Sequence, residues 1–145
     1  MQSIQQYPPR WMFRVAISLA ALTAGAAVPA SAQQPPAGRA TVAFATQLPN
    51  VPGKSLTAVV VRYAPGEASG PHHHAGSVFA YVLSGAIRSQ VSTSGAAKVY
   101  QSGESFFEPP GSDHLVSANA STTEPASLLA IFVADHGATL TMPDK

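Results

Sequence analysis

The sequence contains no cysteine, so no disulfide can stabilise the fold, even in an oxidising compartment. Charge is also scarce, because Asp, Glu, Lys and Arg together make up only 10% of the residues. There is no basic cluster of the kind that binds nucleic acid, and after residue 32 no apolar pattern keeps a helical period over eleven residues. These absences exclude a disulfide-rich, helical or nucleic-acid-binding protein. Stability must come from an apolar core, aided by a metal or a partner subunit.

The first 32 residues have the organisation of a secretory signal peptide. Arg10 and Arg14 give a positive start, residues 15–28 form an uncharged apolar run, and residues 30–32 (Ala-Ser-Ala) supply a small-residue cleavage site. The alternative is a membrane anchor, but the run is shorter than the roughly 20 residues that span a bilayer. We therefore predict cleavage, export to the periplasm or the medium, and no stable membrane anchor.

The remaining residues, 33–145, are enough for one domain. They keep six of the eight Lys and Arg and all seven Asp and Glu, so their net charge is −1 and not the positive charge of the whole chain. Residues 33–40 form a Pro-rich, flexible linker, which leaves 41–145 for the domain.

Short segments rich in β-branched and apolar residues alternate with Gly- and Pro-containing turns along this domain. The pattern predicts strands at 41–48, 56–63, 78–84, 86–91, 98–101, 104–108, 114–119 and 127–134. The tail from residue 135 has no clear pattern. Strands of this length and spacing are typical of an all-β sandwich or barrel.

Three consecutive histidines, His72 to His74, precede one of the clearest strands. Successive strand residues point to opposite faces, so His72 and His74 share a face and His73 points away. Two imidazoles on one face form half of a metal site, and His114 is the natural third donor.

Two sets of residues match, with their spacings, the two short motifs of the cupin superfamily: Gly66, His72, His74 and Gly85, followed by Gly103, Pro109, Gly111 and His114. The chain therefore resembles the small, single-domain, type-2-like cupins over residues 41–134. The resemblance implies a double-stranded β-helix, or jelly-roll barrel, in which the second-motif histidine faces the first-motif pair. It also implies a homodimer and a small-molecule ligand.

The sequence departs from the family pattern at one metal ligand. The first-motif carboxylate would fall at Val78, which cannot bind a metal. Glu108 is the only acid within an apolar segment, and it could bind the metal, orient a histidine or act as a general base. The alternative is a solvated residue at a strand end. Gln90 and Ser77 are weaker candidates for additional site residues.

These residues predict one divalent metal ion, Fe, Zn, Mn, Ni or Cu, bound by His72, His74 and His114. The leading hypothesis is an exported metal-binding cupin that acts on a small molecule. Fe or Cu would favour dioxygenase-like chemistry, whereas Zn or Ni would favour isomerase- or lyase-like chemistry at a carbonyl or carboxylate. The alternatives are a non-catalytic module that binds a small ligand or metal, and a metal-free structural barrel.

Overall fold

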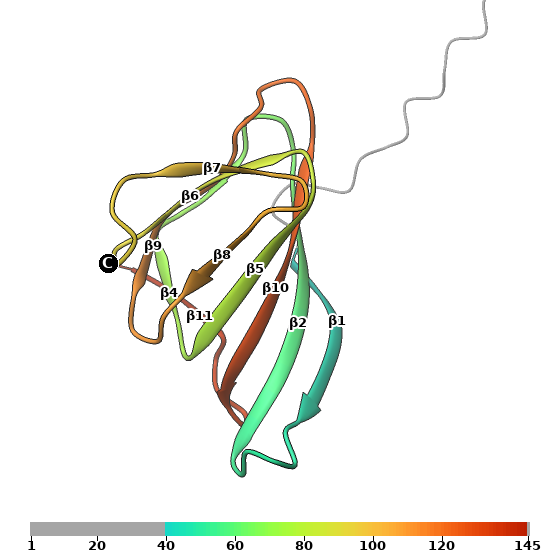
Figure 1. The fold of residues 1–145 in the computed structure, drawn as a ribbon, viewed down its shortest axis with the longest axis vertical. Helices are drawn as coiled ribbons and strands as arrows, with labels where there is room; N and C mark the ends of the chain where they lie inside the picture. Colours follow the sequence, from blue (N-terminus) through green and yellow to red (C-terminus); the bar gives the residue numbers. More distant parts are fainter. Residues whose placement is uncertain (1–39, 145) are drawn as a thin grey trace, which may run out of the picture. The chain divides into compact units, whose positions relative to one another are not determined.

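A computed structural model describes residues 40–144, which form two antiparallel β-sheets (Figure 1). The predicted signal peptide and all of the predicted linker except Ala40 lie outside the described residues. Export and the positions of these two boundaries therefore stay predictions. In the described part of the chain, no helix is long and apolar enough to cross a membrane.

The first sheet has five strands in the order β1-β2-β10-β5-β8. Their bounds are β1 Ala40–Gln47, β2 Lys54–Tyr63, β10 Ala126–Asp135, β5 Ser77–Ser84 and β8 Ser105–Glu108. The second sheet follows the order β11-β4-β9-β6-β7, with β3 paired to β9 beside this path. Its bounds are β11 Thr141–Pro143, β4 His72–His74, β9 Asp113–Asn119, β6 Ala86–Val91, β7 Lys98–Gln101 and β3 Ala68–Ser69.

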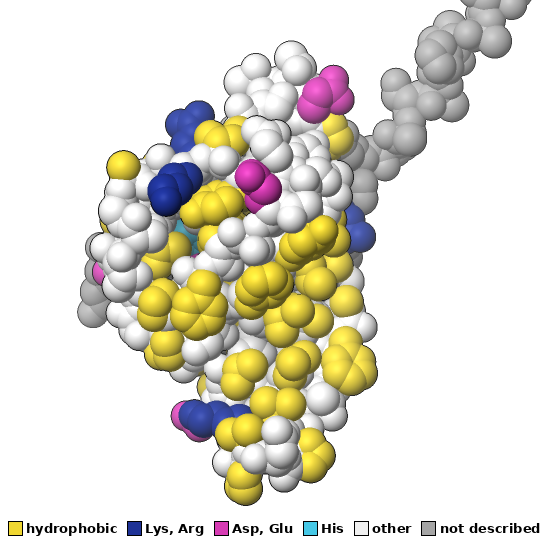
Figure 2. Space-filling view, viewed as in Figure 1, with side chains coloured by type: hydrophobic (Ala, Val, Ile, Leu, Met, Phe, Trp, Pro, Cys, Tyr) yellow, Lys and Arg dark blue, Asp and Glu magenta, His cyan; other side chains and the backbone are white. Residues whose placement is uncertain are grey.

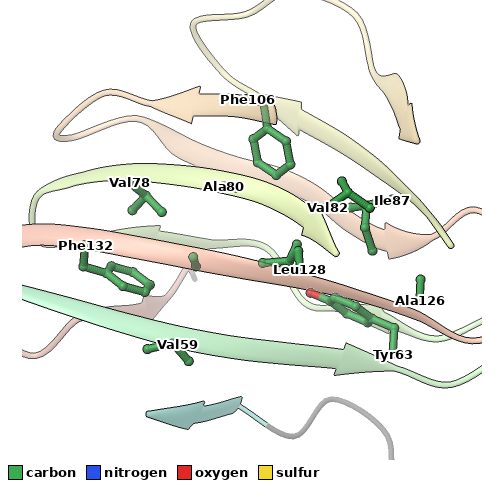
Figure 3. Packing of buried hydrophobic residues seen from close by; sticks show 11 residues of the cluster. Val59, Tyr63, Val78, Ala80, Val82, Ile87, Phe106, Ala126, Leu128 and Phe132 are labelled. Carbon is green, nitrogen blue, oxygen red and sulfur yellow. The ribbon is translucent and has the colours of Figure 1, made fainter. Parts of the chain in front are cut away.

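The apolar core lies on the inward faces of these strands (Figure 3). Alternate residues of β5 and β10 are buried, as expected for strands with one face turned to the interior. Val78, Val82 and Ile87 are the largest side chains that are fully buried. Tyr63 is also buried, and its hydroxyl group lies 2.8 Å from Ser117 Oγ, so its one polar atom has a partner.

Glycine is required at two positions where another part of the backbone lies too close for a Cβ atom. Gly85 joins β5 to β6 with a φ of 68°, and a Cβ there would lie 2.5 Å from the carbonyl oxygen of Pro125. A Cβ on Gly76 would overlap the carbonyl oxygen of Val133. Any larger residue at these positions would force the sheet backbone to move.

The all-β prediction is confirmed, and each predicted strand corresponds to an observed one to within about two residues. The strand pattern did not predict β11, in the tail that had no clear assignment. This strand has only three residues and includes Pro143. It forms by backbone pairing with β4, which leaves no periodic apolar pattern in the sequence.

The outer face of the first sheet carries large apolar side chains. Phe79 and Tyr81 on β5 and Phe107 on β8 are all exposed, and Phe79 lies directly opposite Phe107 in the register. Figure 2 shows hydrophobic side chains spread over the face that carries these strands. A continuous apolar surface of this kind is typical of an interaction site.

Candidate metal centre

Strands β4 and β9 bring the three predicted histidine ligands together. His72 lies directly opposite His114 in the antiparallel register, so their side chains project from the same face. His74 is two residues beyond His72 and projects from that face too. One ligand atom from each of the three lies within 4.8 Å of the other two, as a shared metal ion requires.

An irregularity in β9 helps to aim His114 inward. The register between β6 and β9 shifts so that Gln90 pairs with Val116 while Val91 pairs with His114. Residues at 114 and 117 would face opposite sides of a regular strand, because their separation is odd. The bulge allows both His114 and Ser117 to be buried, a common use of bulges beside functional sites.

Backbone carbonyl groups orient the two histidines of β4. His72 Nδ1 lies 2.7 Å from the carbonyl oxygen of Gly70, and His74 Nδ1 lies 3.0 Å from that of Leu140. A carbonyl only accepts, so both Nδ1 atoms carry the proton and donate it. Each ring is left with Nε2 as its unprotonated nitrogen, the form that binds a metal.

A serine orients His114, and it holds the ring through Nε2 and not through Nδ1. Its Nε2 lies 2.8 Å from Ser89 Oγ on the neighbouring strand β6. Its Nδ1 faces the interior and lies 3.1 Å from Glu108 Oε2. Glu108 Oε2 also lies 3.5 Å from His74 Nε2, so the carboxylate sits against two of the three rings.

The residues present fit a metal ion. Glu108 and His114 are each only 3% exposed, yet Glu108 Oε2 and His114 Nδ1 have no hydrogen-bond partner, because their close approach lacks hydrogen-bond geometry. Buried polar atoms without partners are costly, and their occurrence usually has an explanation. Three converging imidazoles, with a carboxylate against two of them, form a donor set that a divalent cation satisfies.

Burial shapes the charge of this centre. Desolvation is the main cause that lowers the pKa of His74 below its usual 6.5, although Glu108 and the carbonyl oxygen of Leu140 act in the opposite direction. His74 is therefore neutral near pH 7. A neutral imidazole is the state that a metal ion needs.

The three histidines and Glu108 line a cavity of about 540 Å³. Most of the remaining wall is apolar, with contributions from β2, β5, β8 and β10. Those apolar residues include Val59, Ala80, Phe106, Leu128 and Phe132. None of the described residues that line the cavity is Lys or Arg.

The weaker sequence candidates lie outside this cavity. Gln90 donates its side-chain amide to the carbonyl oxygen of Gly95, and Ser77 precedes the buried Val78, so both lie on the strand face opposite the cavity. His73 points away from the site, as strand alternation predicts, and contacts Asp144. The sequence did not indicate Ser89 or the carbonyl group of Leu140 as histidine partners, because nothing in a serine or a backbone atom marks it as one.

The fold and the motif residues define the class of this protein. A family described as the Cupin domain matches residues 59–132, about half of the chain. The chain therefore belongs to the cupin superfamily, as the two sequence motifs indicated. A search of curated proteins finds no significant match.

Solved structures agree on the fold. A conserved protein of Klebsiella pneumoniae with a double-stranded β-helix domain is 20% identical, with a TM-score of 0.57 over 77% of this chain and 89% of the other. A DMSP lyase of Ruegeria pomeroyi is 19% identical, with a TM-score of 0.53 over 61% and 42%. Oxalate decarboxylase of Bacillus subtilis, which has Mn(II) centres, is 28% identical, with a TM-score of 0.51 over 61% and 23%. This chain thus corresponds to less than half of either enzyme.

Proposed function

We propose that this protein is an exported cupin that binds one divalent metal ion through His72, His74 and His114 and uses it to act on a small molecule. The observation that carries the proposal is the convergence of the three histidines at the wall of an otherwise apolar cavity. An imidazole is expensive to bury without a partner, and here three are buried or half-buried around one point.

The cavity favours a compact ligand with an apolar body and one polar end. Its volume of about 540 Å³ is in the range of small-molecule sites. The polar end would approach the histidines, and the body would pack against side chains such as Phe106 and Phe132. A dicarboxylate fits less well, since the described lining offers no Lys or Arg for a second negative group.

The chain's own residues would hold and shield such a ligand. A divalent ion at the three histidines would supply Lewis acidity toward a carbonyl, carboxylate or phenolate oxygen, or a centre for O2 if it is iron or copper. The apolar wall limits the access of water, which strengthens electrostatic interactions at the site. Glu108 is the only carboxylate in the described lining of the cavity, and so it is the residue placed to accept a proton or to bind the ion.

Metal content tests this proposal first. The purified protein should retain about one ion of a single metal per chain, or take it up on reconstitution with Fe, Mn, Ni, Cu or Zn. The His72→Ala/His114→Ala variant should retain none. The absence of binding by the wild-type protein after every reconstitution would contradict the proposal.

Turnover assays then separate an enzyme from a binding module. Diketones, phenolic compounds and sugar acids are suitable substrates for a first screen, with the double histidine variant as the blank. Turnover that depends on metal supports an enzyme. Ligand-induced stabilisation of the metal-loaded protein without turnover supports a non-catalytic, small-ligand-binding cupin.

Export and dimerisation complete the proposal. Export rests on the signal-peptide pattern of residues 1–32 and is tested by cell fractionation and the N-terminal sequence of the mature protein. A homodimer rests on the family resemblance and on the exposed apolar face that includes Phe79 and Phe107. Sedimentation of the wild-type protein and a Phe107→Lys variant tests it, because a charge at that face should favour the monomer.

A further inference from the structure

The missing first-motif carboxylate has a structural counterpart on the neighbouring strand. Val78, where the motif would place that carboxylate, is fully buried in β5. In the β5–β8 register, the residue directly opposite Val78 is Glu108. Directly opposed residues of an antiparallel pair project from the same face of the sheet. A carboxylate at 108 therefore enters the interior from the same face, displaced by one strand.

The contacts of Glu108 place its Oε2 against two of the three candidate histidine ligands. Its Oε2 lies 3.1 Å from His114 Nδ1 and 3.5 Å from His74 Nε2. These are the nitrogen atoms that remain for a metal when His74 donates to the carbonyl oxygen of Leu140 and Nε2 of His114 is paired with Ser89 Oγ. The carboxylate thus faces, on each ring, the nitrogen atom that has no hydrogen bond to another residue.

This arrangement argues against a simple hydrogen-bonded role for Glu108. If Glu108 accepted a proton from His114 Nδ1, the other ring nitrogen would have to bind the metal, yet Nε2 is already bonded to Ser89. With Nε2 protonated, a nitrogen lone pair and a carboxylate oxygen face each other at 3.1 Å, in a buried place where neither atom has a hydrogen-bond partner. Two such acceptors repel each other unless a cation lies between them.

We infer that Glu108 is the fourth protein ligand of the metal ion, a carboxylate that has moved from the first-motif position on β5 to the paired position on β8. The inference rests on the proposed function, because it needs a metal at the three histidines. It gives the centre three neutral imidazoles and one negative carboxylate. An oxygen ligand favours Fe(II) or Mn(II) relative to a site of three imidazoles alone.

Mn(II) binding by Glu108→Gln is the direct test, because the substitution keeps the size of the side chain and removes its charge. Glu124→Gln is the matched control, since Glu124 is exposed and does not line the cavity. Affinity is measured by the EPR signal of free Mn(II) during titration of the metal-free protein. We expect binding at least about tenfold weaker for Glu108→Gln and unchanged for the control.

Co(II) spectra distinguish a ligand from a positioning residue. Loss of a carboxylate ligand should change the intensity and position of the visible Co(II) bands in Glu108→Gln. Weaker affinity with an unchanged spectrum would give Glu108 only a positioning role and would overturn the inference. Equal affinity and an unchanged spectrum would also overturn it, while leaving a three-histidine site intact. Failure of the wild-type protein to bind any metal would instead sink the proposed function.

A swap of the two paired positions tests the displacement itself. Val78→Glu/Glu108→Val returns the carboxylate to the motif position and keeps one valine and one glutamate at the two paired positions. Metal affinity should recover to within about tenfold of the wild-type value, whereas Glu108→Val alone should resemble Glu108→Gln. A folded swap variant that binds no better than Glu108→Val would contradict the equivalence of the two positions. The circular dichroism spectrum tests whether each variant is folded. If the swap variant does not fold, the comparison of Glu108→Gln with Glu124→Gln decides the inference.

Discussion

Strands β4 and β9, together with Asp144 just after β11, carry two clusters of potential metal ligands. The inner cluster is His72, His74 and His114, and the outer cluster is His73, Asp113 and Asp144. In each cluster the ligand atoms lie within 4.8 Å of one another. Proximity of donors therefore does not distinguish the two.

The difference lies in burial and in the partners of the polar atoms. In the outer cluster, His73 Nδ1 lies 2.6 Å from Asp144 Oδ1, and both side chains are partly open to water. Such a pair is already satisfied without an ion. In the inner cluster, His114 Nδ1 and the adjacent Glu108 Oε2 are buried without hydrogen-bond partners. Buried ligand atoms without hydrogen-bond partners, and not clustering alone, therefore indicate a metal centre.

Removal of each cluster in turn should have the largest effect and show which of them binds metal. We expect His72→Ala/His114→Ala to abolish metal binding, and His73→Ala/Asp144→Ala to leave about one ion per chain. Metal analysis after gel filtration measures both. Melting gives an independent readout, because a metal at 1,000 times its Kd stabilises the wild-type fold by about 4 kcal/mol. Retention of metal by the first variant, or its loss from the second, would reverse the assignment.

Ser89→Ala changes a residue beside the inner cluster, where it contacts His114. The variant loses the contact of 2.8 Å between Oγ of Ser89 and Nε2 of His114, which holds the ring in place. We expect metal affinity to fall about 10- to 100-fold, the usual cost of losing a partner that orients a ligand. Ser84→Ala is the control, since Ser84 bonds Ser127 on the exposed side of the first sheet. Titration with Mn(II) measures both, and equal affinities would show that Ser89 has no orienting role.

The extent to which the sequence predicted these features differs from residue to residue. The convergence of His72, His74 and His114 was predictable because strand alternation and motif spacing fix their face and their order. Glu108 was recognised as unusual for an acid in an apolar segment. Its role could not be decided, because that depends on the β5–β8 register, which joins Val78 to Glu108 through pairing of segments 30 residues apart.

The part that Leu140 and β11 play at the site could not be predicted from the sequence, for a different reason. Leu140 orients His74 through a carbonyl group, and any residue would supply the same atom. β11 is held by pairing with β4 and by the hydrogen bond from Asp144 N to the carbonyl oxygen of Pro71. Backbone interactions of this kind leave no side-chain pattern, so neither the strand nor its role could be read from composition or periodicity.

Acidification of the metal-free protein probes the buried His74 of the inner cluster. The folded-state pKa of His74 lies below the unfolded value of about 6.5, chiefly because of burial. The unfolded chain therefore binds more protons between the two values, so the contribution of His74 to stability is complete above about pH 6.5 and declines as the pH falls below it. Urea unfolding at pH 7.5 and 5.5 measures this, with His74→Gln as control. An equal decline in the control would show that another group is responsible.

Asp144→Asn should give the smallest effect and completes the comparison from the outer side. The substitution removes the charge that faces His73 but keeps the main-chain bond to Pro71. Because the pair is partly exposed, we expect a loss of at most about 1 kcal/mol in unfolding free energy, smaller still at high salt. Metal affinity should not change. Urea unfolding at low and high salt, with Mn(II) titration alongside, measures both quantities. A marked loss of metal affinity would mean that the outer cluster, by holding β11 in place, also sets the position of Leu140 and the orientation of His74, and the two clusters would then form one functional unit.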